Sequence, residues 1–163
     1  MVKLIAHRGN LRGSNPEREN SPDYIMEALN KGYHVEVDVY SKDGDLYLGH
    51  NEPKYEVRKN LLRFNRIICH AKDKEALRIM LEDGEIHCFW HENDDYTITS
   101  EGLVWVFPSK PLIPNSVCVL PEYAKREDLE GIKECYAICS DYVEELDEQG
   151  ERSSVKDWVF NHA

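Results

Sequence analysis

The stretch Val35-Glu36-Val37-Asp38-Val39-Tyr40 decides the fold of this chain. Its valines favour a strand, and the run is almost continuously apolar apart from two carboxylates. Such a run is typical of a parallel strand that is covered on both faces, because in a strand with one exposed face apolar residues alternate with polar ones. Since side chains alternate along a strand, Glu36 and Asp38 are expected to leave the same face.

Short apolar runs of the same kind recur along the chain, with helix signals between some of them. The first expected helix begins at the cap Ser21 with Pro22 next to it, and it stops at Gly32. Further helices are expected over 73–84, 121–134 and 143–149. The expected strands are 4–6, 35–40, 66–71, 87–90, 103–107, 117–120 and 136–139.

Alternating strands and helices predict an α/β fold, namely a TIM-type parallel β/α barrel that is closed or nearly closed. No linker or repeat divides residues 1–163, so a single domain is expected. The length of 163 residues is short for such a barrel, which typically takes about 250. The connections 93–102 and 109–115 are too short for full helices, so the barrel is expected to be trimmed, with short or missing outer helices. Oligomerisation is one way to cover the exposed wall. Trp158 is expected to pack the tail against the bottom of the barrel.

Composition excludes several classes of partner. The chain has 31 acidic and 20 basic residues, a net charge of -11, which disfavours a nucleic-acid backbone as ligand. No secretory signal, membrane span or basic amphipathic segment is apparent, so we expect a cytoplasmic protein without a membrane partner. Five cysteines without a CxxC pair are interpreted as reduced core residues.

Polar residues interrupt the apolar runs near their ends, where barrel enzymes carry their chemistry. Glu36 and Asp38 on one strand face predict a divalent cation with oxygen ligands, because unpaired buried carboxylates are costly. The alternative is an edge strand with a solvated face.

Two histidines and two cations complete the candidate set. His7 and His50 are candidates for proton transfer, since histidine titrates in the range that a phosphodiester reaction needs. Arg8 and Lys72 could neutralise phosphate oxygens. Each of these residues alone is more often structural or simply exposed.

Four segments together resemble the amino-terminal signature of the glycerophosphodiester phosphodiesterase family, within the PLC-like phosphodiesterase superfamily. They are IAHRG at 5–9, PERENS at 16–21, VEVDV at 35–39 and DGDLYLGH at 43–50. The segment SDY at 140–142 is similar to the family's terminal Thr-Asp-Tyr. The chain is thereby identified as a short, divergent member.

The resemblance implies roles for individual residues. It implies that His7 and His50 are the general acid and base, and that Glu36 and Asp38 bind magnesium or calcium. It places Glu19 in the immediate surroundings of the metal and implies that Arg8 binds the phosphate.

One departure from the family pattern affects the metal. The family has Glu-x-Lys on the third strand, whereas this chain has His70-Ala71-Lys72. Lys72 is kept as a phosphate ligand, and His70 replaces a carboxylate in the metal site. An imidazole ligand shifts the preference towards manganese or another transition metal.

The expected function is a metal-dependent phosphodiesterase that hydrolyses a small glycerophosphodiester or a related polyol-phosphate diester. Its partner would be that small-molecule substrate. Two alternatives stay open: a non-catalytic barrel that binds phosphate or a polyol, and a phospholipase D-like enzyme.

Overall fold

The computed structural model describes residues 2–150, in which one ten-stranded sheet organises the chain. The strands follow the order β4-β3-β2-β1-β10-β9-β8-β7, and β5 pairs with β2 and β6. Trp158 lies outside the described residues. The strands are β1 (Lys3–His7), β2 (His34–Lys42), β3 (Asp45–Leu48), β4 (Tyr55–Val57), β5 (Ile67–Ala71), β6 (Cys88–Phe89), β7 (Tyr96–Ile98), β8 (Val104–Val106), β9 (Ser116–Val119) and β10 (Ala137–Ser140).

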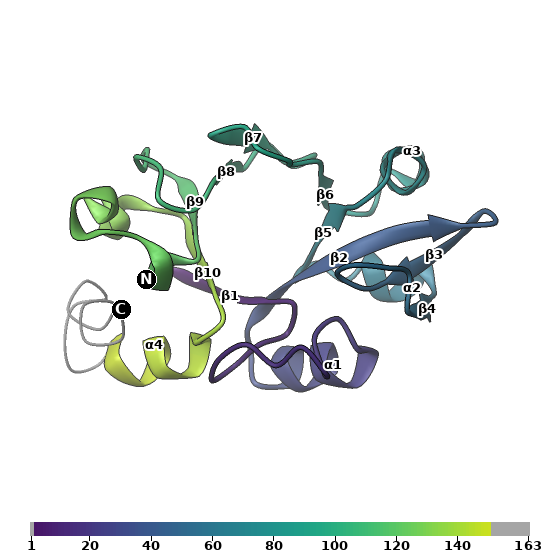
Figure 1. Ribbon diagram of the computed structural model, residues 1–163, viewed down its shortest axis with the longest axis horizontal. Coiled ribbons are helices and arrows are strands. Elements are labelled where there is room, and N and C mark those ends of the chain that lie inside the picture. Colours follow the sequence, from purple (N-terminus) through teal and green to yellow (C-terminus); the bar gives the residue numbers. More distant parts are fainter. Residues whose placement is uncertain (1, 151–163) are drawn as a thin grey trace.

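Most of this sheet is parallel and curled. Strands β6, β5, β2, β1, β10, β9 and β8 are neighbours in this order and run parallel. The sheet curls until its ends approach each other near β6 and β7 (Figure 1). A 2.8 Å hydrogen bond from Ser100 N to the Cys88 carbonyl joins the two ends. The predicted α/β fold with a parallel sheet is therefore confirmed, as a curled half-barrel and not as a fully closed barrel within residues 2–150.

An antiparallel extension follows β2 and was not predicted. Asp43 and Gly44 form a two-residue turn with φ values of 53° and 88°, the geometry of the tight hairpins that twisted strands favour. The turn returns the chain along β2 as β3, and β4 adds a further antiparallel strand. This extension carries His50 in the loop after β3.

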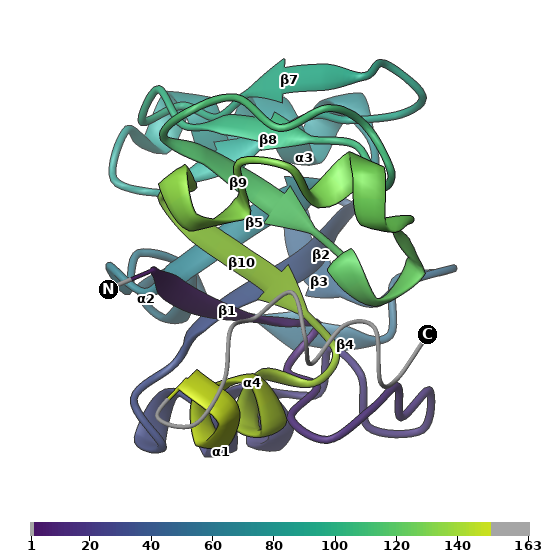
Figure 2. The ribbon, with the colours of Figure 1, turned by 90° about the vertical axis from the view of Figure 1, so that its left-hand side faces the viewer.

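Three α-helices begin where the sequence predicts, and a fourth, α2 (Lys59–Leu62), was not predicted. In α1 (Pro22–Asn30) the Ser21 side chain accepts a hydrogen bond from Tyr24 N, and in α3 (Lys74–Asp83) Asp73 caps Ala76 N. The remaining α-helix is α4 (Val143–Gly150). Helices α1 and α4 lie side by side along one flank of the sheet (Figures 1 and 2).

The predicted helix over 121–134 is wrong. Three short 3-10 turns occupy the segment: η1 (Pro121–Tyr123), η2 (Arg126–Leu129) and η3 (Ile132–Glu134). Extended backbone at Ala124, Lys125 and Glu130 separates them, and Gly131 takes a positive φ of 86°. The buried Leu129 and Ile132 therefore reach the core from separate turns, and a continuous helix is not needed to bury them.

The two connections predicted to lack helices do lack them. Residues 93–102 form β7 and its flanking turns, and residues 109–115 contain no helix. Tyr96, Ile98 and Ile113 are exposed as a result, Ile98 to 68%. The prediction of a homo-oligomer stays a prediction.

Two earlier expectations concern buried thiols and membranes. All five cysteines are free and buried, as predicted. Within the described residues, no helix combines the length and apolarity that crossing a bilayer requires.

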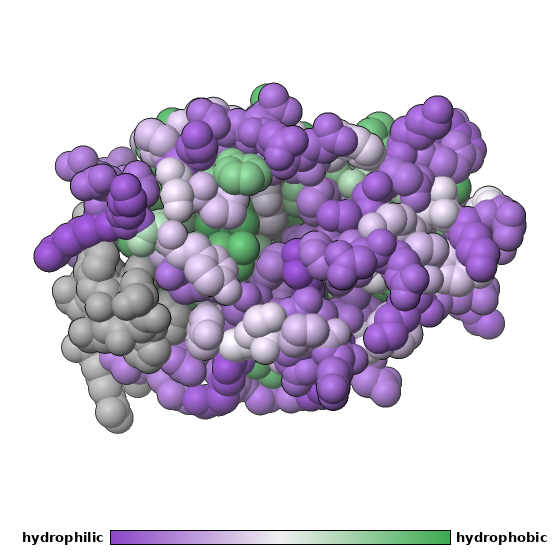
Figure 3. All heavy atoms as spheres, viewed as in Figure 1, coloured by the Kyte–Doolittle hydropathy of each residue, from purple (hydrophilic) through white to green (hydrophobic). Residues whose placement is uncertain are grey.

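The inner face of the curled sheet is apolar towards the amino ends of its strands. Ile5, Ile68, Phe89 and Trp105 belong to one buried cluster on that face, while a larger cluster packs the outer face against α1 and α3. Apolar residues show mainly inside the hollow of the curled sheet, and the surrounding surface is hydrophilic (Figure 3).

Candidate active site

The predicted site residues extend the inner face of the sheet towards the carboxyl ends of its strands. His7 follows Ile5 by two positions on β1, and His70 follows Ile68 by two on β5, so each shares the inner face. Strand register places His7 opposite Glu36. It also places Asp38 opposite His70. Parallel pairing thus brings residues that lie far apart in sequence to one end of the sheet.

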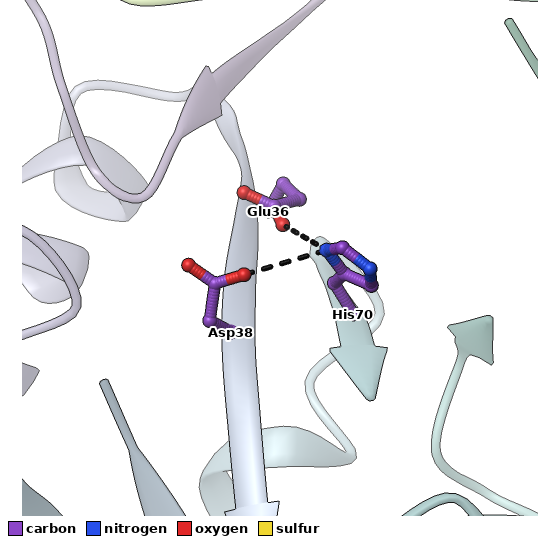
Figure 4. A group of neighbouring side chains, drawn as sticks. All are labelled: Glu36, Asp38 and His70. Carbon is purple, nitrogen blue, oxygen red and sulfur yellow. Dashed lines mark ion pairs between the residues drawn. The ribbon is translucent and has the colours of Figure 1, made fainter. Parts of the chain in front are cut away.

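Glu36, Asp38 and His70 form a compact group that could hold a metal ion. One ligand atom from each lies within 4.8 Å of the others. His70 Nδ1 is 3.7 Å from Glu36 Oε1 and 3.4 Å from Asp38 Oδ1, between the two carboxylates (Figure 4). Both carboxylates are buried, with exposures of 2% and 1%.

The hydrogen bond on the far side of the His70 ring turns Nδ1 towards the two carboxylates of this group. His70 Nε2 lies 2.9 Å from the carbonyl oxygen of His91. A carbonyl only accepts, so Nε2 carries the proton. Nδ1 then faces two carboxylates, an arrangement that is stabilised either by a second proton on the ring, which pairs it with both acids, or by a cation among the three atoms. Phe89, stacked on the ring at 4.8 Å, holds this orientation.

The two carboxylates have opposite electrostatic environments. Asp38 lies 3.0 Å from Arg8 Nε, 3.2 Å from His50 Nδ1 and 3.7 Å from Lys72 Nζ. Burial alone would raise the pKa of Asp38, but its hydrogen bonds to His50 and His70, followed by the charges of Arg8 and Lys72, outweigh it and lower that pKa. Burial, and next the charge of Asp38, raise the pKa of Glu36. Glu36 is therefore the carboxylate that a bound cation would stabilise most.

Each candidate acid/base histidine is held through Nδ1 by a carboxylate. His7 Nδ1 lies 2.8 Å from Asp141 Oδ1, and His50 Nδ1 lies 3.2 Å from Asp38 Oδ2. The carboxylate acceptors assign the proton to Nδ1 and leave Nε2 for proton transfer. His7 Nε2 is 3.9 Å from Glu36 Oε2. Burial lowers the pKa of His7, but the hydrogen bond to Asp141 and the charge of Glu36 outweigh it and raise that pKa.

A polar pocket of about 360 Å³ adjoins the group. Arg8, Glu19 and His50 line it, and Arg8 Nη1 lies 3.2 Å from Glu19 Oε2. Glu19 is not among the three grouped residues, and its other oxygen accepts hydrogen bonds from Asn10 and Ser14. The remaining lining residues are Ser14, Pro16, Gly49, Asn51, Glu52 and Lys54.

Three residues that complete these contacts were not predicted as part of the site. The buried Asn20 accepts a 2.8 Å hydrogen bond from Asp38 N and donates one of 3.0 Å to Asp38 Oδ2. Asn10 and Asp141 meet at 2.8 Å beside His7. The sequence held a signal for Asp141, which lies in the segment SDY, and for Asn20, which precedes the helix cap, but none for Asn10.

Gly49 sets the course of the loop that carries His50. A Cβ at this position would lie 2.0 Å from the Glu52 carbonyl oxygen, which requires the loop to shift. We expect Gly49→Ala to displace His50 and to lower turnover by up to about 10²-fold, the cost of a misplacement near 1 Å. Gly44→Ala is the control, because its Cβ meets nothing within 4 Å and only its φ of 88° is unfavourable. Equal turnover of the two variants in a steady-state assay would contradict this account.

The fold and the site together define an α/β protein with a buried acid and histidine group at the carboxyl ends of its parallel strands. No protein-family model matches the sequence. No curated protein matches it either. A crystal structure of a proposed glycerophosphodiester phosphodiesterase from Galdieria sulphuraria is similar, with 12% sequence identity and a TM-score of 0.47. The match covers 91% of this chain and 97% of that one. A likeness of this extent assigns neither a family nor an activity.

Proposed function

We propose that this chain is a metal-dependent phosphodiesterase that hydrolyses a small glycerophosphodiester or a related polyol-phosphate diester. The observation that carries the proposal is a pair of carboxylate-held histidines around a buried group of two carboxylates and one imidazole. One such histidine is common in structural roles. Two of them, each held through Nδ1 beside a candidate cation site, form the acid and base pair of a phosphodiester reaction.

Arg8 and Lys72 bind the phosphate oxygens in this proposal, since both cations lie beside Asp38. His7 Nε2 takes the proton of the attacking water or of a neighbouring substrate hydroxyl, and His50 Nε2 gives a proton to the departing oxygen. One P–O bond forms as the other breaks. The products are an alcohol and a phosphomonoester, reached directly or through a cyclic phosphate.

Glu36, Asp38 and His70 would hold the divalent ion. When bound, such an ion stabilises charge on the phosphoryl oxygens and lowers the pKa of the attacking hydroxyl. The carboxylates suit magnesium or calcium, and the imidazole adds manganese as a candidate.

The surroundings of the site support two finer proposals. The pocket beside His50 is lined by Ser14, Asn51 and Lys54 without a large apolar side chain, which suits a hydroxylated alcohol and disfavours the acyl chain of a phospholipase D-like substrate. The position of the site at the carboxyl ends of β1, β2 and β5 favours a trimmed TIM-type barrel.

The proposal is tested with metal-stripped protein, a panel of glycerophosphodiesters and bis(p-nitrophenyl) phosphate. We expect phosphodiester cleavage after addition of magnesium, calcium or manganese and none in excess chelator. Tight metal or phosphate binding without cleavage of any substrate would instead favour the non-catalytic binding module.

A further inference from the structure

We infer that Glu122 is a positioning residue, which holds Asp141 and through it the ring of His7. The inference rests on the proposed function where it concerns turnover, and on geometry alone where it concerns the His7 ring. Glu122 lies in η1, on a segment over which the sequence predicts a helix and leaves the role of Glu122 open.

The contacts of Glu122 converge on the corner after β10. Its Oε1 accepts a 2.9 Å hydrogen bond from Asp141 N, and its Oε2 accepts one of 3.1 Å from Ser140 Oγ. Tyr142 N in turn donates to Ser140 Oγ at 3.0 Å. One carboxylate therefore fixes the backbone of the residue whose side chain bonds His7 Nδ1 at 2.8 Å.

Glu122 is buried, although glutamate side chains usually lie at the surface. Its exposure is 6%, and within residues 2–150 it forms no ion pair with a cation. Ionised carboxylates are rarely buried without a cation, because desolvation is costly. Neutral donors at both oxygens compensate part of this cost.

The backbone just before Glu122 is strained, and this strained turn brings Glu122 to Asp141. Leu120 adopts φ 48° and ψ 57°, a left-handed conformation that costs a non-glycine residue energy. Leu120 N still bonds the Cys139 carbonyl at 2.7 Å, so the chain leaves β9 abruptly at this point. The turn places η1 over the end of β10, where Glu122 reaches Asp141.

The test compares Glu122→Ala and Glu122→Gln with Asp83→Ala. Asp83 is a carboxylate that pairs with Arg63 at 2.8 Å, away from His7. Two properties are measured: the NMR signal of the His7 Nδ1 proton, and kcat and KM separately with bis(p-nitrophenyl) phosphate.

We expect Glu122→Ala to abolish or broaden the His7 Nδ1 proton signal and to lower kcat by about 10- to 100-fold with little change in KM. In Glu122→Gln the side-chain oxygen can still accept a hydrogen bond from Asp141 N, and the amide NH2 can donate one to Ser140 Oγ. This variant should therefore retain the proton signal and most of kcat. Asp83→Ala should change neither. If Glu122→Ala does not fold, Glu122→Asp is used, whose shorter side chain cannot reach both donors.

An unchanged proton signal and kcat in a folded Glu122→Ala or Glu122→Asp protein would overturn the inference, as would an equal loss in Asp83→Ala. The proton signal decides the matter even if no substrate is cleaved, so failure of the proposed function and failure of this inference are distinguishable.

Discussion

Replacing His7 by alanine is expected to lower kcat by about 10²- to 10⁴-fold, the usual contribution of a positioned acid or base. His7 Nε2 faces the buried carboxylates, and Asp141 fixes the ring through Nδ1. Alanine removes the proton acceptor and leaves the strand pairing of β1 with β2 and β10 in place. The fold should therefore persist while turnover is lost.

The pH dependence gives a second readout of the same substitution. A base acts in its unprotonated form, so the rate should fall as the pH drops through the raised pKa of His7. That acid limb should be missing from the residual activity of His7→Ala. His34→Ala is the control, since His34 lies at the opposite end of the sheet, at the start of β2. Full activity in His7→Ala would remove this residue from the mechanism.

The sequence sufficed for the parts of the site that strand periodicity controls. Two carboxylates at alternate positions of one strand must share a face, and parallel pairing places His7 opposite Glu36 and Asp38 opposite His70. The same argument fixes the inner face, because Ile5 and Ile68 precede the two histidines by two residues each. Of these features, the sequence predicts the shared face of the two carboxylates; the register and the inner-face position of the two histidines are findings of the structure.

The remaining contacts depend on loop conformations that no local pattern specifies. Asn20 reaches Asp38 because its backbone takes a positive φ of 61°, and Arg8 likewise has a φ of 54°. Asn adopts such a conformation more readily than most residues and Arg does not, and no local pattern marks either position for it. The sequence left the role of Glu122 open for a related reason. The spacing of apolar residues after Pro121 resembles a helix, and the separate turns that replace it place Glu122 over β10.

Glu36→Gln is expected to change metal affinity and metal-free stability in opposite directions. The substitution removes a charged oxygen ligand, so affinity should fall by at least about 10²-fold. Without metal, burial and Asp38 make the ionised form of Glu36 unfavourable. A neutral amide of the same shape avoids this cost, and the carbonyl oxygen can still accept the 3.3 Å bond from Arg8 N. The metal-free variant should therefore unfold at a higher temperature than the parent protein at neutral pH.

The sign of this stability difference follows from proton linkage. The pKa of Glu36 is raised on folding, so the folded state binds the proton more tightly and metal-free stability declines as the pH rises above the ordinary glutamate value of about 4.3. The advantage of Glu36→Gln should accordingly grow above that pH and vanish below it. Calorimetric titration with manganese and thermal unfolding at several pH values measure the two effects. Glu19→Gln, the same substitution outside the three-residue group, serves as the comparison. Unchanged metal affinity in Glu36→Gln would reject the assignment of Glu36 as a ligand. An equal loss of metal affinity in Glu19→Gln would show that Glu19, which pairs with Arg8, also belongs to the metal site.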